Sequence, residues 1–158
     1  MRVLHHQLRS RKRILVRGGV AVYHVISRTA CRQFLFGPKE KEVFCALLFQ
    51  QAQFAGVEVL SYCIMSDHVH LLLRVAPVEA LSDDALLRRY AAYYGESKVP
   101  LSAYSVEELR HVLAEGGSLA EATRARIISR MGDLPAFMRE LKQRFSIWYN
   151  HQHENQGT

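Results

Sequence analysis

The chain has 158 residues, of which 49% are hydrophobic and 23% are charged, and its formal net charge is +6. This length fits one domain with a substantial hydrophobic core, and the composition excludes a disordered chain. No apolar run approaches the length needed to span a bilayer, and no apolar segment follows the basic N-terminus as in a signal peptide. We therefore expect a cytoplasmic protein with no membrane partner.

The first 17 residues form a basic arm that contains no acidic side chain. Its basic residues are Arg2, Arg9, Arg11, Lys12, Arg13 and Arg17. Such an arm suits a polyanion such as nucleic acid. A solvated terminus that aids solubility is an equally good interpretation.

The first half of the chain predicts the order strand, helix, strand, strand. Residues 18–30 alternate and are rich in Val and Ile after a Gly-Gly pair, as is typical of a strand. Pro38 and Gly56 bound a segment with apolar residues at helical spacing. Residues 57–64 and 68–75 predict two strands, and the short M-S-D turn between them fits only antiparallel pairing. The fold class expected is α+β.

Three cysteines, Cys31, Cys45 and Cys63, are odd in number and far apart, with no C-x-x-C motif. This spacing favours reduced thiols over a disulfide frame or a zinc cluster. We expect them to be buried as small hydrophobic residues.

The second half predicts helices. Residues 82–95 open with a capping serine and two acids and close on glycine. Residues 105–117 and 118–132 each begin with S-x-x-E, the pattern of a capping box, and end at glycine.

A last helix is expected to start at Asp133 and to run through residue 152. Its apolar face consists of Phe137, Leu141, Phe145 and Trp148. Three basic residues lie mostly off that face: Arg139, Lys142 and Arg144. They fit either a DNA-binding surface or an ordinary solvated helix face.

His68 and His70 stand one residue apart in an otherwise apolar predicted strand. Alternate residues of a strand project to the same face, so the two imidazoles can share one divalent cation while Val69 faces the other way. The pattern alone is weak, since His151 and His153 repeat it on a predicted helix, where residues i and i+2 diverge. The first pair needs an explanation because burying unpartnered imidazoles costs free energy.

Three segments together resemble one family. Y-C-I-M-S-D-H-V-H-L-L-L-R-V resembles the HUH motif (His, hydrophobic, His) of single-tyrosine transposases, in particular the REP-associated tyrosine transposases of bacteria. Residues 13–28 resemble that family's first strand, G-G-x-x-Y-H-V-x-S-R, and residues 137–158 resemble its L-K-Q-R-[YF]-S-x-x-[YF]-N helix and the loop that follows. The resemblance implies a single domain over residues 1–158 with a ferredoxin-like antiparallel sheet, helices on one face, and a helical insertion at about 96–132.

The resemblance also implies a function, the metal-dependent cutting and rejoining of single-stranded DNA next to hairpins. In such enzymes a tyrosine hydroxyl is the nucleophile, and Mg²⁺ or Mn²⁺ acts as a Lewis acid on the scissile phosphate. His68 and His70 match the metal ligands. The residues expected to contact single-stranded or hairpin DNA are Arg11, Lys12, Arg13, Arg28, Arg139, Lys142 and Arg144.

Two features depart from the family pattern. The residue before the first His is usually Asn, and here it is Asp67, which either adjusts metal affinity or caps the turn. The family nucleophile lies in a Y-I-x-x-N-P segment after a further strand, so we expect a fragment that ends before its last strand and tyrosine helix. The sheet edge left open would then need a helix or a partner chain, as in a homodimer.

Tyr149 is the candidate nucleophile within the chain, because His153 one turn further on would supply a third metal ligand. Against this, Tyr149 matches a packing position of the family helix. His24 fits either a structural role or a contact with DNA. Two other functions remain open: a DNA-hairpin-binding module without catalysis, and a different metal phosphoesterase that shares H-x-H, which the flanking matches disfavour.

Overall fold

The computed structural model describes residues 18–29, 35–78, 80–95 and 103–153. In these ranges the elements are β1 (Ala21–Arg28), α1 (Pro38–Ala55), β2 (Val57–Ile64), β3 (His68–Val75), α2 (Asp83–Tyr94), α3 (Val106–Glu115), α4 (Gly117–Ile128) and α5 (Leu134–Gln152). The predicted α+β class and element order are confirmed. No helix within the described ranges is long and apolar enough to cross a membrane. The described ranges do not include Cys31 or the six basic residues of the arm, which are Arg2, Arg9, Arg11, Lys12, Arg13 and Arg17.

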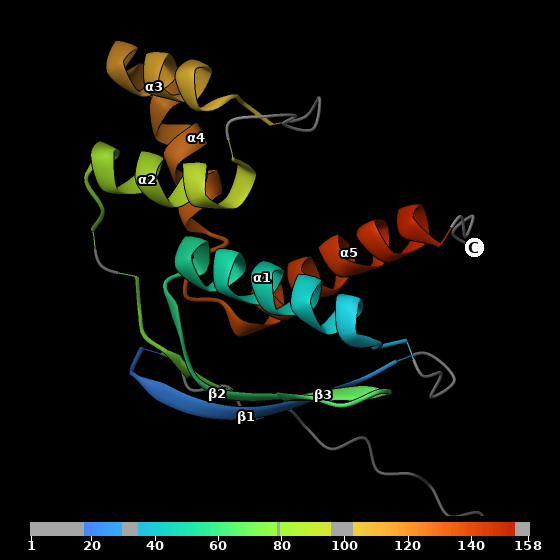
Figure 1. Cartoon of the computed structure of the whole chain (residues 1–158). Helices are drawn as coiled ribbons and strands as arrows, with labels where there is room; N and C mark the ends of the chain where they lie inside the picture. The colour runs from blue at the N-terminus through green and yellow to red at the C-terminus, as the bar shows by residue number, and fades with distance from the viewer. Residues whose placement is uncertain (1–17, 30–34, 79, 96–102, 154–158) are drawn as a thin grey trace, which may run out of the picture.

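The described strands form an antiparallel sheet in the order β1-β3-β2, so β3 is central. Helices cover one face of this sheet, and no described helix covers the other (Figure 1). Alternation along β3 decides which residues meet the helices: Val69, Leu71 and Leu73 are buried beneath them. The residues that alternate with them along β3, including His68 and His70, therefore project from the uncovered face.

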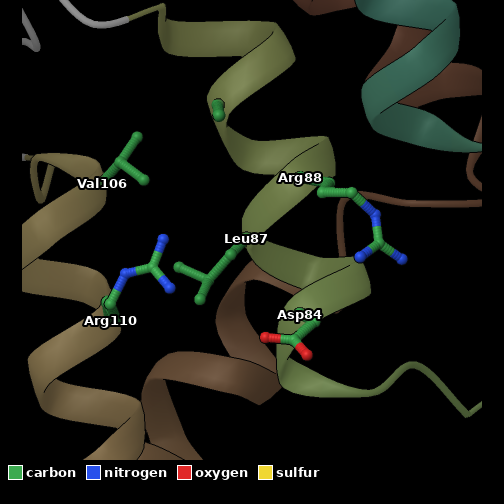
Figure 2. Close-up of a pocket in the computed structure, with 6 residues that line it drawn as sticks. Asp84, Leu87, Arg88, Val106 and Arg110 are labelled. Carbon is green, nitrogen blue, oxygen red and sulfur yellow. The ribbon is translucent and has the colours of Figure 1, made fainter.

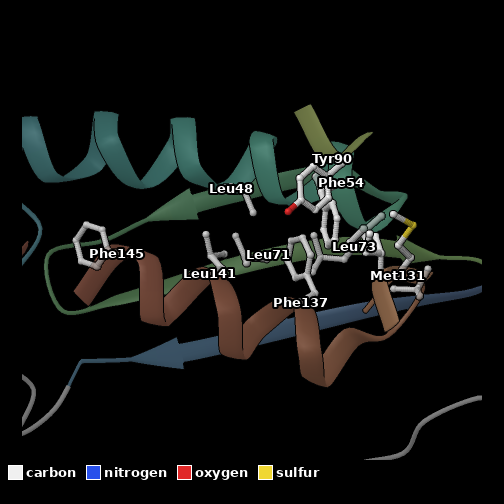
Figure 3. Close-up of a cluster of buried hydrophobic side chains, with 14 of the residues drawn as sticks. Leu48, Phe54, Leu71, Leu73, Tyr90, Met131, Phe137, Leu141 and Phe145 are labelled. Atoms are coloured by element: carbon white, nitrogen blue, oxygen red, sulfur yellow. The ribbon is translucent and has the colours of Figure 1, made fainter. Parts of the chain in front are cut away.

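The core lies between β3 and the helices α1 and α5. Leu48 of α1, Leu71 of β3 and Leu141 of α5 point toward one another and are fully buried (Figure 3). Phe54 and Phe137 are also fully buried. Because burying one such side chain contributes about 1.5–3 kcal/mol, this cluster fixes how α1 and α5 sit on the sheet.

The helix boundaries largely follow the predicted caps. Pro38 occupies the first turn of α1, and Gly56 ends it in the left-handed conformation. The capping box of Ser105 is present at the start of α3. The box predicted at Ser118 is wrong, because α4 begins at Gly117 with no side-chain cap.

The reason for this difference is the pair of glycines between α3 and α4. Gly116 and Gly117 have φ angles of 68° and 75°, which favour glycine over residues with a Cβ. They complete the reversal before Ser118, which is left exposed within the first turn of α4. Helix α3 lies beyond α2, away from the sheet, and α4 runs from it back behind α2 (Figure 1).

The expected burial of the cysteines is wrong for Cys63, which is exposed. Cys63 pairs with His70 in the β2–β3 register and so shares the uncovered face of the sheet. Cys45 is partly buried, and its Sγ lies 3.3 Å from Tyr62 Oη. Both thiols are free.

Candidate metal and DNA site

His68 and His70 stand at the start of the central strand β3. Their ring centroids are 5.0 Å apart and the rings cross at 72°. The register places Arg28 of β1 opposite His68, and Ile26 opposite His70. Directly opposed residues of antiparallel strands project to the same face, so Arg28 also belongs to the uncovered face beside the histidines.

A third imidazole joins the pair from β1. His24 Nε2 lies 2.9 Å from His70 Nδ1, and the two rings stack with centroids 5.2 Å apart. The sequence leaves the role of His24 open and does not predict this contact, because the contact depends on the cross-strand register. The sequence does contain one signal for this contact, because both predicted strands, residues 18–30 and 68–75, carry histidines.

Asp67 contacts the other histidine of the pair. Its Oδ1 lies 2.6 Å from His68 Nδ1, and about a quarter of each side chain is exposed. The backbone carbonyl of Asp67 accepts hydrogen bonds from Thr29 N at 2.9 Å and from Thr29 Oγ1 at 3.0 Å. These bonds tie the β2–β3 turn to the end of β1, so the carboxylate is held beside His68.

The donor set of the histidine pair fits a divalent metal ion with an incomplete protein shell. Within the described residues, no group of three or more His, Cys, Asp or Glu side chains is placed to hold a metal. An ion on His68 and His70 would therefore complete its coordination with water or with phosphate oxygens, as catalytic metals with open positions do. Imidazole suits Mn²⁺ better than the harder Mg²⁺.

Tyr149 lies elsewhere. It is part of α5 on the helical side of the sheet, where its ring packs against Phe145 and stacks on His153 with centroids 4.2 Å apart. His153 Nε2 in turn lies 3.1 Å from Glu40 Oε1. The structure therefore does not bring Tyr149 or His153 to the histidine pair, which projects from the opposite face.

The predicted basic residues of α5 separate into two groups. Arg139 and Lys142 line a groove of about 580 Å³ between α5 and the outer edge of β1, and His24 lines the same groove. Arg144 instead packs among the helices, where Nη2 donates to Gln50 Oε1 at 2.8 Å and the guanidinium lies 4.5 Å from the ring centroid of Tyr93. Burial lowers the pKa of Arg144.

A second pocket, of about 280 Å³, lies between α2 and α3 (Figure 2). Asp84 and Arg88 of α2 and Arg110 of α3 contribute charged groups to it. None of its residues belongs to the histidine site, and none was predicted from the sequence as a site residue.

Comparison with known proteins gives one match. The family model described as "Transposase IS200 like" matches residues 20–90, which contain all three described strands, α1, His24, Asp67 and the histidine pair. Neither the curated proteins nor the solved structures provide a match to the chain. The predicted resemblance to single-tyrosine transposases is therefore confirmed for the segment that carries the sheet and the histidines, and this segment is similar to the IS200-like transposases.

Proposed function

We propose that the protein is a transposase-type domain that cuts and rejoins single-stranded DNA next to hairpins with the help of Mg²⁺ or Mn²⁺. The observation that carries this proposal is the histidine pair on the uncovered face of the central strand, within the segment that matches the transposase family. A bound ion would polarise the scissile phosphate as a Lewis acid.

The chain's own residues have distinct parts in this proposal. His68 and His70 hold the ion. Arg28 lies on the same sheet face, where its guanidinium can pair with a phosphate next to the ion. Arg139 and Lys142 stand in the groove along β1 and would hold the strand further from the ion.

We propose residues 1–158 as one domain, with the basic arm 1–17 and with α3 and α4 as parts of an inserted segment. Two observations support the insertion: the family match ends at residue 90, before α3, and both helices lie away from the sheet. A homodimer through an outer strand of the sheet stays a prediction.

Metal binding tests the proposal directly. We expect calorimetry to detect Mn²⁺ binding to the wild type, with weaker Mg²⁺ binding, and at least a tenfold loss of Mn²⁺ affinity in His68→Ala and in His70→Ala. His111→Ala is a matched control, because His111 is an exposed histidine of α3 that pairs only with Glu115 in the described structure. Equal Mn²⁺ affinity in all four proteins would contradict a metal site at His68 and His70.

One observation favours a second candidate, a DNA-hairpin-binding module without catalysis. Tyr149, the candidate nucleophile, lies on the helical side of the sheet, away from the histidine pair. Such a module would bind hairpin DNA and metal but would form no covalent bond to DNA. An assay for a covalent DNA adduct separates the two functions.

A further inference from the structure

The two histidines of the pair use the same ring atom to contact a neighbour. His68 directs Nδ1 to the carboxylate of Asp67, at 2.6 Å, and His70 directs Nδ1 to Nε2 of His24, at 2.9 Å. The two neighbours come from different elements, the β2–β3 turn and β1. In both histidines the nitrogen left without a described partner is Nε2.

We propose that Asp67 and His24 are positioning residues, which hold the ring proton of His68 and of His70 on Nδ1 and so leave Nε2 of each as the metal-binding atom. This inference rests on the metal site of the proposed function. It gives a role to Asp67 and to His24, whose roles the sequence left open.

The chemistry of the Asp67 contact requires this proton placement for His68, and the contact with His24 is compatible with it for His70. An ionised carboxylate only accepts hydrogen bonds, so the short contact with Asp67 requires a proton on Nδ1 of His68. Between His70 and His24 one nitrogen must donate and the other accept. If His70 donates from Nδ1, His24 accepts at Nε2 and carries its own proton on Nδ1.

The arrangement matters because a metal ligand must be unprotonated and correctly turned. Metal-binding histidines commonly donate their other ring N–H to a carboxylate or another acceptor, which fixes both the tautomer and the ring orientation. Here the orientation needs such support, since these rings lie on a sheet face that no described helix covers. The Thr29 hydrogen bonds to the Asp67 carbonyl supply that support for His68 by anchoring the turn to β1.

The first experiment reads the tautomers without any metal. Long-range ¹H–¹⁵N correlation spectra of the histidine rings, recorded where the imidazoles are neutral, should show Nε2 unprotonated in both His68 and His70. Asp67→Ala should disturb the tautomer of His68 and leave that of His70 unchanged. His24→Phe retains a ring for stacking but no acceptor nitrogen, and it should disturb His70 and leave His68 unchanged.

The second experiment measures Mn²⁺ affinity in the same variants. Removal of such supporting hydrogen bonds typically weakens metal binding about 10–100-fold, and we expect losses of this size in Asp67→Ala and His24→Phe. Asp67→Asn should stay within a few-fold of the wild type, because its amide oxygen still accepts from Nδ1. This rescue separates positioning through a hydrogen bond from a requirement for the negative charge.

The outcomes distinguish this inference from the function on which it rests. A wild type with the proton on Nε2 of either histidine, or variants with unaltered tautomers and Mn²⁺ affinity, would overturn the positioning roles alone. If His68→Ala and His70→Ala bound Mn²⁺ as the wild type does, the proposed function itself would fail. Because each variant leaves one histidine of the pair undisturbed, that histidine's spectrum reports whether the sheet has folded.

Discussion

Arg130 and Glu140 form a two-bond ion pair within the helical layer. Arg130 Nε and Nη2 each donate to one carboxylate oxygen at 2.9 Å, and the side chains are 24% and 12% exposed. The guanidinium also lies 4.6 Å from the ring centroid of Phe54 and donates to Tyr94 Oη. At this degree of burial, loss of one partner leaves the other charge without compensation.

The first prediction is that Glu140→Gln destabilises the protein by about 2 kcal/mol at neutral pH, between the typical values for exposed and buried pairs. Burial raises the pKa of Glu140, but hydrogen bonds from Arg130 and Gln51 outweigh it and bring the pKa below the ordinary value of 4.5. A lowered folded-state pKa contributes stability that is present above 4.5 and is lost as the pH falls through the folded value. The difference in the free energy of unfolding between the wild type and Glu140→Gln should therefore become smaller in acid.

Urea unfolding at neutral pH and at about pH 3 measures both effects. Glu58→Gln is the control, because the pair of Glu58 with Arg74 has side chains 57% and 47% exposed and should contribute little. A Glu140→Gln protein as stable as the wild type at neutral pH would show that the pair does not stabilise the fold.

At the histidine site, the sequence could predict the shared face of His68 and His70 because strand alternation is a local rule. It could not predict the contact of His24 with His70, since that contact depends on which residues of β1 and β3 face each other. The role of Asp67 could not be predicted for a similar reason. Its carboxylate could cap the turn or act on the neighbouring histidine, and only the side-chain geometry distinguishes these two roles.

At the scale of elements, helix starts were predictable where one cap dominates and not where two starts compete. Ser105 caps α3 by accepting from Glu108 N at 3.2 Å, while Glu108 Oε2 accepts from Ser105 N at 2.7 Å. Ser118 begins the same S-x-x-E pattern, but Gly116 and Gly117 reverse the chain earlier. The S-x-x-E pattern therefore indicates only a preferred helix start, and the backbone conformation of the preceding residues can place the start earlier.

The second prediction follows from this contrast. Ser105→Ala should lower the free energy of unfolding by about 1 kcal/mol, because the exposed amides at the start of α3 lose an acceptor. Ser118→Ala should leave it within about 0.3 kcal/mol of the wild type, since Ser118 caps nothing and alanine is a good helix former. Chemical denaturation of both variants measures their free energies of unfolding. Equal losses of stability in the two variants would mean that α4 starts at Ser118 in solution.

The third prediction concerns the groove between β1 and α5. If Arg139 and Lys142 contact phosphates there, changing both to Gln should weaken the binding of single-stranded hairpin DNA. The slope of log affinity against log salt should also fall by about 1 for each phosphate that the variant no longer neutralises. Fluorescence anisotropy over a range of salt concentrations measures both quantities.

Changing Arg88 and Arg110 together to Gln is the matched control for charge, since both arginines line the other pocket (Figure 2). It should leave the salt slope nearly unchanged. Equal slopes for the wild type and for the double variant in the groove would exclude this groove as the DNA site.

At the scale of the whole molecule, the sheet separates two chemically different sides. The helical side holds the core and the aromatic residues of α5, including Tyr149. The uncovered side holds His24, His68, His70 and Arg28. The sequence could predict both layers from periodicity, but it could not predict on which side Tyr149 falls relative to the histidines, because that depends on how α5 packs across the sheet.

The last prediction follows from this separation: the chain binds hairpin DNA and Mn²⁺ yet forms no covalent DNA adduct through Tyr149. A nucleophile must reach the phosphate that the metal polarises, and Tyr149 stacks on His153 on the other side of the sheet. Labelled single-stranded DNA with a hairpin, incubated with the chain and Mn²⁺, should give no denaturation-resistant complex. A complex that disappears in Tyr149→Phe but persists in Tyr62→Phe, an exposed tyrosine of β2, would instead make Tyr149 the nucleophile and require α5 to move.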